Sequence, residues 1–290
     1  MMHLFRRLCF SLLILGLCTC GYVPLKAPMS LTGGNYEQPV LDSQSIRLLV
    51  WNIHKEGNLE SLQREFAQLW DTQKPNLILL QEVRLDKAST ALFNGQKHYG
   101  WELSANIYQP KLTAYSGVFT AATAAPLDSR ALLSEAREPL LGSAKPKLLS
   151  RFPLSNSDLT LLVLNIHAIN FQLGIKTIEA QLALFKQRVQ EHQGPVIVAG
   201  DFNSWSKKRL ALIEQAAADM QLVQIDFGPQ AAYLATTFGH PLDHIFYSNQ
   251  YLDLIESSVD VFELLSSSDH RALYAEFTLR RPAQNRESLP

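Results

Sequence analysis

Eight polar side chains of the kinds that bind metals or move protons stand where apolar stretches of the sequence end, or in turns beside them. They are Asn52, Glu82, His167, Asp201, Asn203, Asp243, Asp269 and His270. A carboxylate next to a buried strand is costly unless it binds a cation or pairs with a base. The set therefore predicts a site that combines a metal ion with acid–base chemistry.

The donor atoms in this set indicate which metal it would bind. Most of them are oxygens, and all three cysteines, Cys9, Cys18 and Cys20, lie within the first 20 residues. The rest of the chain therefore has no thiols for a zinc ribbon, a disulfide framework or thiol catalysis. Oxygen ligands favour Mg²⁺, with Mn²⁺ as the alternative, over Zn²⁺.

A hard cation held by a few carboxylates is the usual partner of phosphate substrates. Phosphoester hydrolysis also needs a base for the attacking water and hydrogen-bond donors for the phosphorus oxygens. Asp201 or His270 could activate the water. The donors would be Asn203, His167 and Asn170.

Two segments of similar design must position these side chains. In the first, the apolar residues 46–51 lead to Asn52, a helical pattern follows, and the apolar residues 77–80 lead to Glu82. In the second, residues 161–164 lead to His167, a helical pattern follows, and residues 195–199 lead to Asp201. Each reads as a strand–helix–strand unit whose strands are covered on both faces. The repetition predicts one architecture built twice.

Further strands and one helix complete the predicted domain. The strands cover residues 115–123, 147–152, 158–164, 244–247 and 271–279, and Ser206 caps a helix that runs through Met220. Two halves with mixed sheets and outer helices predict an α/β sandwich. Ligands of open α/β sheets bind where the strands end.

Six blocks of the sequence carry a family resemblance. They are Trp51-Asn52, Leu80-Gln81-Glu82, Asn165-Ile166-His167, Gly200-Asp201-Phe202-Asn203-Ser204, Leu242-Asp243-His244 and Ser268-Asp269-His270. In this order, over residues 46–279, they resemble the endonuclease/exonuclease/phosphatase superfamily, which includes deoxyribonuclease-like enzymes. The resemblance implies a four-layer α/β sandwich with two central mixed β-sheets flanked by helices. One departure is that Ala122-Thr123 occupy the stretch where many members carry a hydroxyl residue followed by arginine.

The resemblance also implies a role for each residue. Glu82 would be the main Mg²⁺ ligand, supported by Asn52, and Asp269 would lie near a second metal position. Asp201 would orient or deprotonate the attacking water, and Asn203 would hydrogen-bond the phosphorus oxygens. His270 would contact the scissile phosphate, with Asp243 fixing its tautomer. His167 matches a histidine acid of the deoxyribonuclease-like members, and Asn170 matches a substrate-binding asparagine.

The two ends of the chain differ in composition from the predicted domain at residues 45–280. Residues 1–20 join Arg6 and Arg7 to a short apolar run that ends at Cys20, which is typical of an export signal or a lipoprotein signal. Residues 21–44 read as a flexible tether and residues 281–290 as a polar tail. We expect an exported protein, periplasmic or anchored to a membrane through a lipid on Cys20. The alternatives are plain cleavage, an uncleaved signal anchor and a buried N-terminal helix.

Composition narrows the function classes. The 290 residues are 47% apolar and 18% charged with a net charge of −1, which excludes a disordered chain and a basic nucleic-acid coat protein. We expect a monomeric, divalent-metal-dependent phosphodiester hydrolase of the nuclease kind, whose partner is nucleic acid or another phosphodiester. The alternatives are a phosphatase or sphingomyelinase-like lipid phosphodiesterase, and a catalytically silent binding module.

Overall fold

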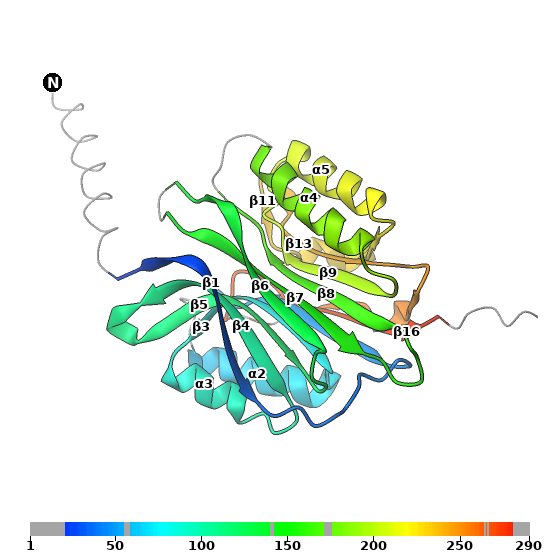
Figure 1. The fold of residues 1–290 in the computed structure, drawn as a ribbon, viewed down its shortest axis with the longest axis horizontal. Coiled ribbons are helices and arrows are strands. Elements are labelled where there is room, and N and C mark those ends of the chain that lie inside the picture. The colour runs from blue at the N-terminus through cyan, green and yellow to red at the C-terminus, as the bar shows by residue number, and fades with distance from the viewer. Residues whose placement is uncertain are drawn as a thin grey trace, which may run out of the picture.

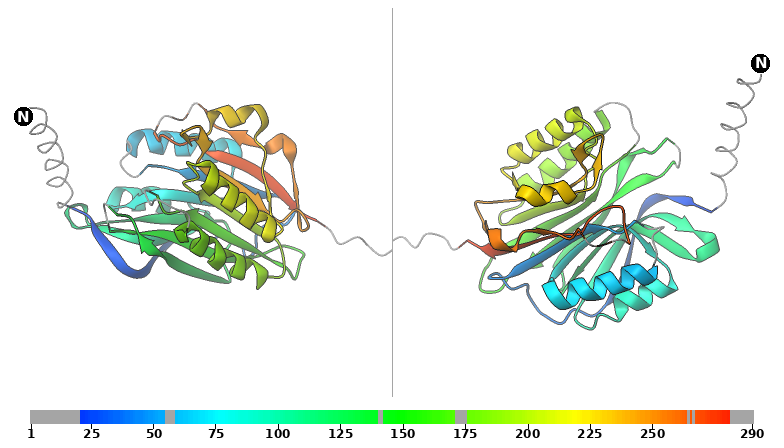
Figure 2. Two further views of the ribbon diagram at one scale, coloured as in Figure 1. Left: turned by 90° about the horizontal axis from the view of Figure 1, so that it is seen from above. Right: turned by 180° about the vertical axis from the view of Figure 1, so that it is seen from behind.

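Two β-sheets pack face to face, and pairs of helices cover their outer faces (Figures 1 and 2). The structure is a computed structural model that describes residues 21–54, 59–139, 142–170, 176–263, 265 and 267–280. The four layers run helices, sheet, sheet, helices, as in the predicted four-layer sandwich. None of the helices in these ranges is long and apolar enough to cross a bilayer.

The first sheet has eight strands and carries the N-terminal half of the site. In spatial order the strands are β1 (Val23–Gly34), β4 (Gly100–Gln109), β5 (Ala114–Ala122), β3 (Leu77–Leu85), β2 (Ile46–Asn52), β16 (Leu273–Leu279) and β14 (Leu252–Leu254), with β15 (Asp260–Val261) beside β16. Strands β2 and β3 are parallel, and the other pairs are antiparallel. The helix α2 (Leu59–Gln73) connects this parallel pair, as the apolar spacing predicts.

The second sheet has six strands and carries the other half of the site. In spatial order they are β10 (Val223–Gln224), β13 (Asp243–Tyr247), β9 (Val196–Asp201), β8 (Thr160–His167), β7 (Ala144–Pro153) and β6 (Asp128–Arg137). Here β8 and β9 form the parallel pair, connected by α4 (Lys176–Gln190). The predicted duplication of a strand–helix–strand unit is therefore present, one copy in the middle of each sheet.

The remaining helices cover the outer faces next to these units. Helix α3 (Lys87–Asn94) lies beside α2, and α5 (Lys207–Asp219) lies beside α4 (Figure 1). The predicted cap of α5 is present, because the Ser206 side chain accepts a hydrogen bond from the Arg209 amide. Short elements complete the chain: η1 (Pro110–Leu112), η2 (Gly228–Tyr233), β11 (Thr236–Thr237), β12 (His240–Pro241) and η3 (Glu256–Ser258).

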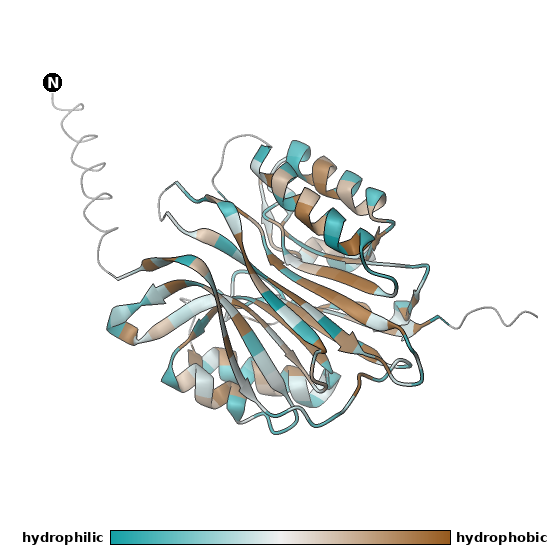
Figure 3. Cartoon of the chain, in the orientation of Figure 1, coloured by the Kyte–Doolittle hydropathy of each residue, from teal (hydrophilic) through white to brown (hydrophobic). Residues whose placement is uncertain are grey.

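Three apolar cores hold the layers together. The central one lies between the two sheets, and the other two lie between each sheet and its own helices. The middle strands of both sheets are accordingly apolar along most of their length (Figure 3). Burial of this kind stabilises the fold by roughly 25 cal/mol per Å² of apolar surface removed from water.

A pair of buried amides crosses the central core. The Gln81 Nε2 atom donates to Oδ1 of Asn165 at 2.8 Å, and Asn165 Nδ2 donates to the Phe119 carbonyl at 2.8 Å. Both side chains are fully buried. Since unpaired amides in an apolar core are costly, these bonds fix how the two sheets are aligned on each other.

The structure departs from the sequence prediction at the tether. Residues 23–34 form strand β1, which pairs with β4 at the edge of the first sheet, instead of a flexible segment. An edge strand needs hydrogen bonds on one side only, so it tolerates Pro24 and Pro28, and its register shifts between Pro24 and Met29. The N-terminal signal and the tail at residues 281–290 lie outside the described residues.

Candidate active site

The site lies where the parallel strands of both sheets end, and Asn52 joins the two sheets there. Asn52 is the last residue of β2 and is buried. Its Nδ2 atom donates to Oδ2 of Asp201, at the end of β9, at 3.0 Å. Its Oδ1 atom accepts from the backbone amide of His54 at 3.1 Å. Two sequence-predicted residues from different sheets are therefore in direct contact.

Glu82 reaches the site through an irregularity in β3. The register of β3 against β5 shifts between Leu80 and Val83, and Glu82 has a φ of 55°. A left-handed conformation is unfavourable for a residue with a side chain and is kept where the surrounding structure requires it. The bulge leaves Leu80 and Val83 in the core while the Glu82 carboxylate, 19% exposed, lies 3.7 Å from Nε2 of His167.

Asp201 is the most enclosed carboxylate of the site. It follows Gly200, where a Cβ atom would lie 2.1 Å from the Ile166 carbonyl oxygen, so only glycine lets β8 and β9 approach this closely. Besides the bond from Asn52, Asp201 accepts the Asn203 backbone amide at 2.8 Å. Burial raises the pKa of the Asp201 carboxyl to about 7, and the charge of Asp243 acts in the same direction.

The backbone of Asn203 has a left-handed conformation, as does that of Glu82. Its φ is 49°, and its Nδ2 atom donates to the Ala168 carbonyl at 2.9 Å. These contacts tie the loop after β9 to the loop after β8. An amide nitrogen carries two hydrogens, so one N–H of Asn203 remains for a ligand.

Asp243 and His270 form the predicted pair. Asp243 lies opposite Asp201 in the β13–β9 ladder, and its Oδ2 atom is 2.6 Å from Nδ1 of His270. Burial alone would lower the pKa of His270. The charge of Asp243 and its hydrogen bond outweigh burial and, with help from Asp201, raise the pKa of His270 to about 10. The imidazole is therefore a cation at neutral pH.

Hydrogen bonds to the end of β2 in the first sheet hold the backbone of His270 in place. The Ser268 hydroxyl donates to the Asn52 carbonyl at 2.6 Å and accepts the His270 backbone amide at 3.1 Å. The indole N–H of Trp51 donates to the His270 carbonyl at 3.1 Å. The end of β2 thus fixes both an amide at the site and the loop that carries the histidine.

The imidazole of His167 lies near three ionisable side chains, those of Glu82, Asp201 and Lys145. Its Nε2 atom lies 3.6 Å from Asp201 Oδ2 and 2.9 Å from Nζ of Lys145 on β7. Lys145 also lies 3.2 Å from Oε1 of Glu138. His167, Lys145 and Glu138, with Glu82, border a cavity of about 30 Å³, which is large enough for a water molecule.

Sequence reasoning missed part of this cluster. Lys145 and Glu138 are not among the site residues predicted from the sequence. Both belong to the β6–β7 hairpin region, where no long apolar run marks a strand end. Lys147, two residues after Lys145, does not join the site, because it packs 5.5 Å from the ring centroid of Phe185 on α4.

Two predicted site residues lie at the margin. The Asp269 carboxylate is 69% exposed and is 3.4 Å from Nδ1 of His54. Asn170 is half-buried and adjoins residues 171–175, which are outside the described part of the chain. His244, which matches no catalytic position, is buried between Ser204 and Gln224, and burial lowers its pKa to about 4.

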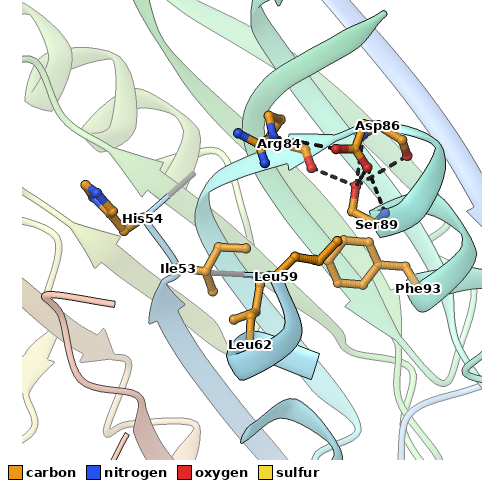
Figure 4. Close-up of a pocket in the computed structure, with 8 residues that line it drawn as sticks. All are labelled: Ile53, His54, Leu59, Leu62, Arg84, Asp86, Ser89 and Phe93. Carbon is orange, nitrogen blue, oxygen red and sulfur yellow. Dashed lines mark hydrogen bonds and ion pairs between the residues drawn. The ribbon is translucent and has the colours of Figure 1, made fainter. Parts of the chain in front are cut away.

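A small cavity next to His54 is not part of this cluster (Figure 4). Its apolar wall comes from residues such as Leu62 and Phe93, and two of its polar residues, Asp86 and Ser89, form the cap of α3. There the Asp86 carboxylate accepts the amides of Ala88 and Ser89, each at 2.9 Å. The polar side of this cavity therefore serves the local fold.

The fold and the cluster together define a class of protein, the deoxyribonuclease-like α/β sandwich with carboxylates, amides and histidines at the strand ends. Residues 49–270 match the model of the Endonuclease/Exonuclease/phosphatase family. The chain therefore belongs to this family, whose members are hydrolases of phosphoester bonds.

Solved structures share the fold at low sequence identity. The endonuclease/exonuclease/phosphatase from Bacteroides vulgatus is 17% identical, with a TM-score of 0.62 over 82% of this chain and 100% of that one. The human Nocturnin catalytic domain with bound sulfate is 17% identical, with a TM-score of 0.60 over 89% and 97%. D. rerio TDP2 complexed with a single-strand DNA product is 16% identical, with a TM-score of 0.57 over 81% and 99%.

Proposed function

We propose that the chain is a Mg²⁺-dependent phosphodiesterase that cleaves nucleic acid. The observation that carries the proposal is the contact of Asn52 from one sheet with Asp201 from the other, beside the Asp243–His270 pair. Among the structural relatives, the Nocturnin structure holds a sulfate anion and the TDP2 structure holds a single-strand DNA product. Both support a site for a phosphodiester.

The donor set fits a hard cation. Asp201, Asp243 and His270 have potential ligand atoms within 4.8 Å of one another. His270, however, is protonated at neutral pH and then offers only donors, so it is a poor ligand. Glu82, at the cavity, would hold Mg²⁺ with support from Asn52. When bound, the cation would withdraw charge from the phosphoryl group.

Asp201 would orient and deprotonate the attacking water. A base works best when its pKa lies near the working pH, and burial brings the pKa of Asp201 to about 7. The hydrogen bonds from the Asn52 side-chain amide and the Asn203 backbone amide hold the carboxylate in one orientation. The free N–H of Asn203 would then donate to a phosphoryl oxygen.

His270 would supply positive charge to the phosphate. Its Nδ1 atom is held by Asp243, so the other ring nitrogen carries the proton that faces a ligand. Because the Asp243 charge keeps His270 protonated, the pair provides a fixed cation for the charge that builds up on the phosphoryl oxygens.

The leaving group would take its proton from His167 only after Lys145 moves. An ammonium group has no acceptor, so the 2.9 Å contact makes Nε2 of His167 the acceptor. A substrate phosphate would attract Lys145 and so let Nε2 of His167 bind a proton. Replacement of His167 by alanine should therefore slow DNA cleavage far more than cleavage of an activated nitrophenyl diester, whose leaving group needs no proton.

A substrate panel tests the proposal. The purified protein is incubated with Mg²⁺ and with plasmid DNA, RNA, bis-p-nitrophenyl phosphate and sphingomyelin in parallel. We expect cleavage of a nucleic acid and of the nitrophenyl diester, and loss of both in excess EDTA. Full activity in EDTA would reject the metal, and turnover of sphingomyelin alone would identify a lipid phosphodiesterase.

We also propose export followed by retention at a membrane, through a lipid on Cys20. The support is the sequence of residues 1–20, in which a cationic start and an apolar run precede this cysteine. Several acyl chains hold a protein firmly at a bilayer, whereas one holds it marginally. A Cys20→Ser variant should remain unprocessed or leave the membrane fraction. A mature wild type with an unmodified N-terminus beyond Gly21 would rule the anchor out.

A further inference from the structure

Phe238 is the most exposed large apolar side chain in the described part of the chain. It is 84% exposed, whereas the next, Leu127, is 57% exposed. It occupies the tip of the β11–β12 hairpin, in which Thr237 pairs with His240. Water contact of this extent is unfavourable for an aromatic ring, so a ligand that covers Phe238 would be stabilised.

The backbone at Phe238 is also unfavourable. The two turn residues, Phe238 and Gly239, have φ values of 52° and 79°. Turns with two positive φ angles favour asparagine or aspartate before glycine, and a bulky residue in this conformation is an outlier. The turn conformation gives no folding reason for the phenyl group, which favours a role for the ring in binding.

The hairpin is fixed to the active site at its base. The Phe202 amide donates to the Leu242 carbonyl at 2.8 Å, and the Leu242 amide donates to the Ala235 carbonyl at 3.0 Å. The Ser204 hydroxyl contacts the Pro241 carbonyl. Phe238 therefore stands on a support built from the loop after β9 and from the residues that lead directly into Asp243.

Trp205 provides a second ring next to Phe238. The ring centroids are 6.3 Å apart and the planes meet at 71°, an edge-to-face arrangement. Trp205 comes four residues after Asp201, and Phe238 comes five residues before Asp243. At roughly 3.5 Å per extended residue, the Cα atoms of Trp205 and Phe238 lie within about 18 Å of the Cα atoms of Asp201 and Asp243, respectively.

Trp205 is held by a buried cation. The Arg209 guanidinium lies 5.0 Å from the Trp205 ring centroid and contacts the Ile169 carbonyl, and Arg209 is only 1% exposed. The indole N–H of Trp205 is buried and finds no acceptor among the described residues. Lys207 and Lys208, next along α5, are exposed and carry charge suited to a phosphate backbone.

We propose that Trp205 and Phe238 form a stacking site for an unpaired nucleobase of a nucleotide that flanks the scissile phosphate. The inference rests on the proposed nuclease function and predicts a preference for single-stranded substrates, because a paired base hides its faces in the duplex. A membrane contact is disfavoured, because one exposed ring among threonines and lysines gives little apolar area for insertion into a bilayer.

Three substitutions of Phe238 in the full chain test the stacking site. Phe238→Leu keeps an apolar side chain but removes the aromatic face, Phe238→Tyr keeps the face, and Phe238→Ser removes both. The matched control, Leu127→Ala, truncates an exposed apolar residue beside β6, at the opposite edge of the six-stranded sheet from β13. Thermal melts check that each variant is folded.

The readouts compare a labelled single-stranded oligonucleotide with the same strand annealed to its complement. We expect Phe238→Leu to lower kcat/KM about tenfold on the single strand and to narrow the preference for it, since a stacked base contributes an effect of this size. Phe238→Tyr and Leu127→Ala should stay within about twofold of the wild type. Equal losses on both substrates, or equal behaviour of the leucine and tyrosine variants, would overturn the inference.

Anisotropy of the labelled single strand in EDTA separates this inference from the proposed function, because it measures binding without cleavage. A wild type that binds through Phe238 but cleaves neither substrate rejects the nuclease and keeps the stacking site. A wild type that cleaves with no effect of Phe238→Leu does the reverse. Co-sedimentation with phosphatidylglycerol vesicles tests the lipid alternative. If the wild type and Phe238→Leu co-sediment and Phe238→Ser does not, the ligand of Phe238 is a lipid surface and the stacking site is rejected.

Discussion

The two strand–helix–strand units have the same topology but present their acids differently. In the first unit, Glu82 lies on a bulge within β3, one residue after the parallel pairing with β2 ends, and is 19% exposed. In the second, Asp201 remains in register opposite His167, and its side chain is 4% exposed. Exposure favours an ionised carboxylate that can accept a cation, whereas enclosure raises the pKa and makes a base. Burial, not topology, therefore separates the roles that we propose for the two acids.

The largest expected effect comes from removing each acid in turn. Glu82→Gln and Asp201→Asn should each lower turnover by about a thousandfold, the scale of a metal or base contribution. Only Glu82→Gln should raise the Mg²⁺ concentration needed for half-maximal rate, because we assign the cation to the first unit. Rate measurements across a Mg²⁺ titration provide the check, and an equal shift in both variants would mean that both units hold the ion.

The next largest loss of turnover is expected at His270 and Asp243, which lie beside Asp201 of the second unit. His270→Ala and Asp243→Asn should each lower turnover by about a hundredfold, a typical share for acid–base residues. If they act as one pair across their 2.6 Å contact, the double variant should lose little more than the worse single variant. Steady-state kinetics of the three variants decides this, and losses that multiply would show that the two residues act independently.

Burial of the site around Asp201 should also make the free energy of unfolding depend on pH. The pKa of Asp201 is raised from 3.8 to about 7, so its folded form binds a proton more tightly and stability falls as the pH rises through this window. The pKa of His270 is raised from 6.5 to about 10, so its contribution also fades as the pH rises, in a higher window.

Urea unfolding in EDTA should therefore show metal-free protein losing stability between pH 5 and pH 9. Asp201→Asn should remove the lower part of this slope, which amounts to about 3 kcal/mol between pH 5 and pH 7. His270→Ala should remove the upper part. Glu82→Gln serves as the comparison from the first unit, and a slope that none of these variants changes would place its origin elsewhere.

The smallest expected effect concerns the contact between the units. Asn165→Leu leaves the Gln81 amide and a backbone carbonyl without their partner, which should cost about 1–3 kcal/mol. Adding Gln81→Leu should recover part of this loss, because two apolar groups can pack where two amides were paired. Urea unfolding midpoints measure both steps, and a double variant less stable than either single one would contradict the pairing.

Much of the site could be predicted from sequence because its residues follow apolar strands directly. Asn52, His167 and Asp201 each end a strand of a parallel pair, so a simple rule for strand ends finds them. The same local signals predicted α2, α4, α5 and the capping role of Ser206. The α/β sandwich follows once two such units are recognised, and its four layers are what the family resemblance implies.

The remainder could not be predicted because it depends on tertiary approach or on weak local signals. Lys145 and Glu138 meet His167 only when β7 folds against β8. Strand β1 has the prolines and glycines of a linker and is a strand only because β4 offers it an edge. Helix α3 is capped at Asp86 by a capping box that Ser89 closes in place of the usual glutamate, so its start departs from the common sequence pattern.

The bond between Asn52 and Asp201 joins positions 149 residues apart, and this separation bears on how the enzyme matures. Contacts within each strand–helix–strand unit close short loops and can form early, whereas contacts across the sheets close long loops and form late. Helices and sheets can thus exist before any catalytic site does. Recovery of activity during refolding should therefore lag behind recovery of the far-ultraviolet circular dichroism signal, so that catalytic competence reports the docking of the two halves.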